Sequence, residues 1–233
     1  MTTIVYLGDR MISDTRGSIQ EKGFNTPNGE TSLINDNISK FVVLNGNYPW
    51  DDRLQMSVMG VAGNLQSKDR LTKFLSRLRF PLEQLLLSLD RSSGSLYNLI
   101  GLTTHTSAII CMDDGSSLTL SISKNNFRYC IPDRRVKACG SGAYYFEATK
   151  EIFAIDPIDL FRIATSVDRH SSKNQFTESV YDTVDKEWVT NDFFLEFDKP
   201  LELEVLVNGF HPNIRAMFTS VLVDNEKSDT KKT

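Results

Sequence analysis

The order of the predicted secondary-structure elements favours an α+β fold, in which antiparallel sheets are covered by paired helices. Blocks of strand-like segments are separated by two pairs of helical segments, and the chain ends in further strands. Single strands do not alternate with single helices, as a parallel βαβ sheet would require. The 233 residues are 40% hydrophobic and 24% charged, which is typical of a folded globular chain.

The N-terminal segment predicts a β-hairpin. Residues 3–7 form a β-branched and aromatic run, Gly8-Asp9 interrupts it, and residues 10–14 resume an extended pattern. Residues 23–37 are rich in Gly, Pro, Asn, Ser and Thr, which predicts a loop.

The next segment predicts two strands, at 40–44 and 54–61, followed by two helices. The apolar run at 41–44 suggests burial on both faces of its strand. A helix over 65–79 follows from the helical spacing of Leu71, Phe74, Leu75 and Leu78, and Pro81 begins a second helix that ends at Leu89.

The second half of the chain predicts strands, then a helix pair, then strands again. The expected strands are 97–103, 107–112, 117–121, 127–131, 135–139, 201–207 and 214–223. The expected helices are 143–154 and 157–170, with Pro157 in the first turn of the second and Asp156 as its cap. The polar segment 225–233 is expected to be a flexible tail.

The bulk properties exclude several classes of protein. A net charge of -4 argues against nucleic-acid binding, which needs a concentrated basic face. The longest apolar run spans only residues 108–112, whereas a membrane helix needs about 20 residues. The first residues do not resemble a signal peptide. Three cysteines without Cys-x-x-Cys spacing and three separated histidines predict a reduced, cytoplasmic chain with neither a metal site nor a cofactor.

The first chemical candidate is Thr2. If Met1 is removed, the terminal threonine carries a hydroxyl and a free α-amine. That amine has a pKa of about 7.7–8.0, so part of it can act as a base near neutral pH. The alternative is that a cytosolic protein begins with Met-Thr by chance.

Four further segments hold candidate residues, and each has an ordinary structural alternative. Asp14 ends a strand and can be a turn residue, and Lys40 enters an apolar strand, where it needs a carboxylate partner or has to reach solvent. Ser141 lies between two glycines and can be a helix cap. Asp168 and Ser171 can simply form a polar helix C-terminus.

Taken together and in this order, the segments resemble the proteasome β-subunit family, and more closely the peptidase subunits of the bacterial ATP-dependent two-component protease. The resemblance covers roughly residues 2–175. The segments that carry it are Thr2-Thr3-Ile4-Val5, Ile12-Ser13-Asp14-Thr15-Arg16, Ser39-Lys40-Phe41, Met59-Gly60-Val61-Ala62-Gly63, Gly140-Ser141-Gly142 and Asp168-Arg169-His170-Ser171.

The resemblance implies a four-layer αββα sandwich and a threonine-type endopeptidase. Thr2 would be the nucleophile, its own α-amine the base, and Lys40 a cation held in place by Asp14. The backbone N–H of Gly60 would donate to the oxyanion. A second group would orient the terminal amine, and its members are Ser141, Asp168 and Ser171.

The resemblance also implies partners and a domain organisation. It predicts a polypeptide substrate, a homo-oligomer, which in the family is a ring, and an ATP-driven unfoldase as partner. One domain is expected over residues 1–185, with a β-rich extension over 186–224 packed on it.

The chain departs from the family pattern in three places. The loop between Asp14 and Lys40 is long, Ser172-Lys173 replaces a usual glycine, and the segment around Trp188 has no counterpart. Two alternatives to a peptidase therefore stay open, namely a hydrolase of small amides and an inactive assembly or scaffold subunit. The intact set of candidate residues argues against the inactive subunit.

Overall fold

The computed structural model describes residues 2–20, 32–35, 38–44, 55–79, 81–152, 156–168, 170–173, 175–191 and 194–197. Every strand pairing in this part of the chain is antiparallel. Helices accompany these sheets, so the expectation of an α+β fold is confirmed.

The first sheet has six strands and contains both ends of the described chain. Its order is β10-β1-β2-β11-β12, with β13 also paired to β11. The strands are β1 (Thr3–Tyr6), β2 (Arg10–Asp14), β10 (Lys137–Gly140), β11 (Gln175–Asp182), β12 (Glu187–Thr190) and β13 (Leu195–Glu196). The N-terminal hairpin is confirmed by the pairing of β1 with β2. Strands β12 and β13 lie beyond residue 185 and yet belong to this sheet.

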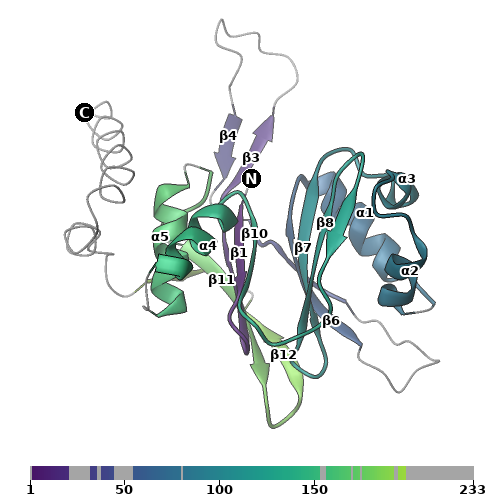
Figure 1. Cartoon of the computed structure of the whole chain (residues 1–233). Coiled ribbons are helices and arrows are strands. Elements are labelled where there is room, and N and C mark those ends of the chain that lie inside the picture. The colour runs from purple at the N-terminus through teal and green to yellow at the C-terminus, as the bar shows by residue number, and fades with distance from the viewer. Residues whose placement is uncertain are drawn as a thin grey trace, which may run out of the picture.

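The second sheet has five strands in the order β5-β6-β7-β8-β9. They are β5 (Phe41–Val43), β6 (Met56–Ala62), β7 (Thr106–Met112), β8 (Ser117–Ile122) and β9 (Phe127–Tyr129). A separate two-stranded sheet joins β3 (Gly17–Gln20) to β4 (Ser32–Asn35). This small sheet lies in the chain between β2 and β5, and Figure 1 shows it near the N-terminus.

Five helices flank the sheets in the described residues. They are α1 (Leu65–Leu75), α2 (Leu82–Ser88), α3 (Ser95–Ile100), α4 (Ala143–Ile152) and α5 (Pro157–Val167). Asn64 caps α1 by accepting the N–H of Ser67, and the expected cap Asp156 accepts the N–H of Ile158 at the start of α5.

Three apolar clusters fill the spaces between these helices and sheets. Val5 and Ile12 of the first sheet pack against Phe146 and Phe161 of α4 and α5. The opposite face of the first sheet meets the second sheet through residues such as Ile4, Tyr6, Met11, Val58, Ile109 and Cys111. The other face of the second sheet packs on α1, α2 and α3. Figure 1 shows this succession of helices, sheet, sheet and helices across the molecule.

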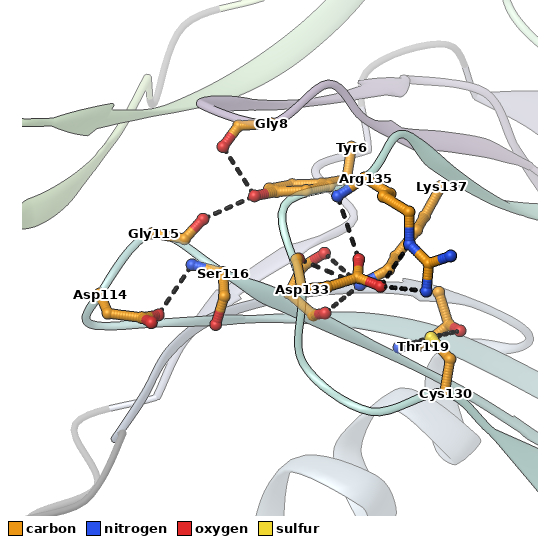
Figure 2. A network of polar contacts seen from close by, with 11 residues as sticks. Tyr6, Gly8, Asp114, Gly115, Ser116, Thr119, Cys130, Asp133, Arg135 and Lys137 are labelled. Atoms are coloured by element: carbon orange, nitrogen blue, oxygen red, sulfur yellow. Dashed lines mark hydrogen bonds and ion pairs between the residues drawn. The ribbon is translucent and has the colours of Figure 1, made fainter.

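The far end of the layer between the sheets, away from Thr2, is held by side chains that donate to the turn between β7 and β8. We call this region the turn end. The indole N–H of Trp188 donates to the carbonyl of Met112 (2.7 Å), and the Tyr181 hydroxyl donates to that of Asp113 (2.8 Å). The Tyr6 hydroxyl lies 2.6 Å from the Gly115 carbonyl and 2.6 Å from the Gly8 carbonyl (Figure 2).

An ion pair between the buried Lys137 and the partly exposed Asp133 borders the turn end. The Lys137 ammonium lies 2.9 Å from Asp133 Oδ1, and its side chain is 9% exposed. It also donates to the carbonyls of Ser117 and Asp133 and to the Ser117 hydroxyl. A buried ammonium is tolerated only when its donors are paired, and these acceptors satisfy it.

Two predictions about local structure are wrong, and a third holds except at one residue. Residues 95–100 form helix α3 instead of the strand expected at 97–103, with Leu96 and Ile100 buried four residues apart and Gly101 ending the helix at φ 73. The segment expected to be a loop contains strand β4. The 41–44 run is buried on both faces, with Phe41 in the layer between the sheets and Leu44 on the helix side, and only Val43 is exposed, at 58%, in the edge strand β5.

The strands expected at 201–207 and 214–223, and the tail at 225–233, lie outside the described residues. No helix in the described part of the chain is long and apolar enough to cross a membrane.

Candidate active site

Thr2 directly precedes β1 and is buried beside the end of β2. Its side chain is 2% exposed, and its hydroxyl donates to Asp14 Oδ1. The N–H of Thr3 donates to the same oxygen at 2.6 Å. The pairing of Ile4 with Ser13 sets this register, so the hairpin itself brings Asp14 to Thr2.

Asp14 is fully buried and accepts four hydrogen bonds. Besides the two from Thr2 and Thr3, its Oδ2 accepts the N–H groups of Arg16 (3.0 Å) and Ser172 (3.1 Å). Burial raises the pKa of Asp14, while the charge of Lys40 and these hydrogen bonds oppose the rise. The carboxylate is therefore the point to which the start of β1, the end of β2 and the segment before β11 are tied.

Lys40 enters the same region from the second sheet. Its side chain is 9% exposed, and its ammonium donates to the carbonyl of Arg16, two residues after Asp14. Burial lowers the pKa of Lys40, the charge of Asp14 opposes this, and the charge of Lys68 adds to it. The structure thus brings the Lys40 ammonium to the segment after Asp14, where it interacts with the Asp14 charge and donates its hydrogen bond to the main chain.

The turn between β10 and α4 closes on Thr2 from the other side. The N–H of Ser141 donates to the Thr2 carbonyl at 2.7 Å, and the Ser141 hydroxyl lies 3.3 Å from the same oxygen. Gly140 has φ 94, and a Cβ there would come within 1.9 Å of the Thr2 carbonyl oxygen. A Cβ on Gly142 would lie 1.8 Å from the Thr3 hydroxyl. Both glycines are needed because the start of β1 passes directly against this turn.

A second carboxylate supports that turn. Asp168 Oδ2 accepts the hydroxyls of Ser141 (2.5 Å) and Ser171 (2.9 Å). Ser171 Oγ in turn lies 2.7 Å from Thr3 Oγ1. Thr2 and Thr3 are therefore held between two buried carboxylates, Asp14 on one side and Asp168 on the other.

Gly60 lies in the middle of β6. A Cβ there would meet Ile4 at 3.0 Å, inside the layer between the two sheets. The neighbouring N–H of Val61 donates toward β5, to the Lys40 carbonyl. Because successive N–H groups of a strand point to opposite sides, the N–H of Gly60 points toward β7. The oxyanion role of Gly60 stays a prediction.

Sequence reasoning missed three contributors to the site. The Thr3 hydroxyl and the Ser172 N–H are contacts that depend on register, and no local pattern marks them. The Lys68 ammonium, on α1, donates to the carbonyl of Ser39, which lies just before β5, at 3.0 Å. The Gly-Ser-Gly turn was a usable signal, because two glycines around one serine indicate a close backbone approach.

Metal-ligating side chains do not gather in this part of the fold. Among the residues that the structure describes, no group of three or more His, Cys, Asp or Glu side chains is placed to hold a metal ion. The groups available to the site are hydroxyls, carboxylates, one buried ammonium and main-chain N–H groups.

Comparison with known proteins finds likenesses among solved structures only. No protein-family model matches the chain, and no curated protein matches it in sequence. Among solved structures, a Gly-1 mutant of Anbu from Hyphomicrobium sp. strain MC1 matches 94% of this chain and 97% of its own at 13% identity, with a TM-score of 0.48. The chemistry of the site is therefore derived from its own residues.

Proposed function

We propose that this chain is a threonine-type amide hydrolase of the N-terminal-nucleophile class, with the four-layer αββα sandwich of that class. Its nucleophile is Thr2, which becomes the terminal residue when Met1 is removed. One observation carries the proposal: the buried Thr2 hydroxyl donates to Asp14 while Ser141 holds the Thr2 carbonyl. A threonine held at both its hydroxyl and its main chain is oriented for one reaction geometry.

The proposed reaction begins with transfer of the Thr2 hydroxyl proton to the free α-amine, directly or through a water. The hydroxyl oxygen then attacks the amide carbon of the substrate and forms a tetrahedral intermediate. Its collapse breaks the C–N bond, the leaving amine takes the proton, and an ester to Thr2 remains. Water hydrolyses this ester and restores the hydroxyl.

The surrounding residues have two proposed roles. Lys40, as a cation close to Asp14, favours the developing negative charge on the Thr2 oxygen. The group Ser141, Asp168 and Ser171 holds the Thr2 carbonyl and the Thr3 hydroxyl, and so orients the residue that carries the α-amine. These roles need no metal or cofactor.

The substrate class and the assembly are part of the proposal. We propose a polypeptide substrate, a homo-oligomer that can form a ring, and an ATP-driven unfoldase as partner, in line with the family resemblance of the sequence. Native mass spectrometry measures the oligomer directly, and a clean monomer would contradict the ring.

The decisive experiment joins intact mass to active-site labelling. We expect a mass lacking Met1, and labelling by an electrophile that captures hydroxyl and amine together. Thr2→Ala abolishes the label, Thr2→Ser keeps it, and Thr183→Ala, at an exposed threonine, leaves it unchanged. A retained Met1, or equal labelling of the Thr2→Ala variant, would reject Thr2 as the nucleophile.

The burial of Thr2 supports a second candidate. A side chain that is 2% exposed with Met1 in place suits a subunit that is silent in this form, or a site that admits only small amides. A silent subunit would assemble, keep Met1 and take no label. A small-amide hydrolase would take the label and turn over short amides while leaving folded or unfolded polypeptides intact.

A further inference from the structure

Lys68 lies on α1, outside the set of residues given roles above, and reaches back toward the site. Its ammonium donates to the carbonyl of Ser39, the residue before Lys40, at 3.0 Å. The carbonyl of Lys40 itself accepts the N–H of Val61 at 3.2 Å. The main chain that delivers Lys40 to the site is therefore fixed on one side by β6 and on the other by Lys68.

The charges around Lys40 come from both sides of the layer between the sheets. Asp14 of β2 attracts its ammonium, and Lys68 of α1 repels it. Lys68 is half-buried, and burial lowers its own pKa while the charge of Asp69 opposes this. The buried ammonium of Lys40 thus interacts with one carboxylate, Asp14, and with a second ammonium, that of the half-buried Lys68. Charges in such a setting interact more strongly than at the surface, because water screens them less.

We propose that Lys68 is a positioning residue for the Thr2 site: it anchors the Ser39 carbonyl, and so the main chain of Lys40, and its positive charge acts on the Lys40 ammonium. This inference rests on the proposed function, in which Lys40 acts as a cation. Because Lys40 works only while protonated, activity falls as the pH rises through the pKa of Lys40. The charge of Lys68 lowers the pKa of Lys40. In a plot of activity against pH, the fall in activity at high pH, which is the basic limb of the profile, therefore begins at a lower pH.

The test compares kcat and KM from pH 5 to 10 in the wild type and in three variants. In Lys68→Met we expect the basic limb to move up by about 0.5 pH unit, because the repelling charge is gone. We also expect kcat to fall roughly 3-fold to 10-fold with KM nearly unchanged, because the anchor of Lys40 is lost. Lys68→Arg keeps the charge and restores the limb. Lys73→Met removes an exposed lysine from the same helix and leaves both quantities unchanged.

A substrate-free measurement separates this inference from the proposed function. The ammonium of Lys40 can be titrated by NMR in lysine-labelled protein, with Lys40→Arg to assign its signal. A higher titration midpoint in Lys68→Met than in Lys73→Met supports the positioning role even if no amide is hydrolysed, in which case the proposed function alone fails. Equal midpoints in the two variants, or a limb that does not move while the wild type is active, would overturn it.

Discussion

The two ends of the layer between the sheets are both polar, but they are polar in different ways. At the Thr2 end, hydrogen bonds converge on the carboxylates of Asp14 and Asp168. At the turn end, aromatic side chains such as Tyr6 and Trp188 donate hydrogen bonds to main-chain carbonyls. A carboxylate can gain or lose a proton and change its bonding, whereas a carbonyl cannot.

This difference separates chemistry from support. Both ends satisfy buried polar groups, which is a requirement of any folded core. Only the Thr2 end gathers two buried carboxylates, Asp14 and Asp168, around the hydroxyl of a residue proposed as a nucleophile. We infer that the contacts at the turn end fix how the two sheets pack on each other. Residues from both sheets can therefore meet at the Thr2 end.

The largest effect should come from Gly140→Ala. The new Cβ would collide with the Thr2 carbonyl, and alanine is strained at φ 94. We expect loss of Thr2 labelling and a stability loss above about 3 kcal/mol. The matched control is Gly101→Ala, where φ is 73 but the nearest atom is the end of the Arg70 side chain at 3.6 Å, and about 1 kcal/mol should be lost. Urea melts compare the two, and equal losses would mean that the turn does not press on Thr2.

Tyr6→Phe should separate the two ends of the layer. It removes the hydroxyl bonded to Gly8 and Gly115 and leaves buried carbonyls unpaired, at a cost of about 1–3 kcal/mol. Labelling of Thr2 in the folded protein should stay the same. Tyr144→Phe, at a tyrosine that is 69% exposed, should change neither quantity. Lost labelling in folded Tyr6→Phe protein would show that the ends are not independent.

Asp133→Asn should alter the acid stability of the turn end. Burial alone would raise the pKa of Asp133, but hydrogen bonds from Lys137 and Arg135 lower it from 3.8 to about 2. A pKa that is lower in the folded state stabilises the fold above pH 3.8, and this contribution disappears as the pH falls to about 2. Urea midpoints at pH 5, 4, 3 and 2 should therefore fall more steeply in the wild type than in Asp133→Asn. Parallel curves would contradict the pairing with Lys137.

The smallest effect concerns thiol reactivity. Cys111 and Cys139 are buried, and burial raises the pKa of both, that of Cys139 to about 12. Cys130 is partly exposed. We expect a thiol reagent at neutral pH to modify Cys130 quickly in the native protein, and all three cysteines in urea. Fast native modification of Cys111 would indicate that the layer between the sheets opens.

Local patterns predicted most elements but missed those that depend on the rest of the fold. The helix at 95–100 was predicted as a strand, because its six residues are too short for periodicity alone to separate a helix from a strand. The 23–37 segment has the composition of a loop, but the pairing of β3 with β4 makes Ser32–Asn35 a strand. Val43 was expected to be buried, and only the position of β5 at a sheet edge explains its exposure.

The sequence by itself determined the N-terminal hairpin, the α+β class and the chemical character of the residues that later meet. Turn residues and side-chain periodicity act over a few neighbours, so a sequence can encode them directly. Only the tertiary structure decided that Asp14 and Ser141 hold Thr2 from two sides, that Gly60 faces the core, and that Lys68 stands behind Lys40. Those contacts join residues far apart in the chain, and they exist only when strand register and sheet packing bring them together.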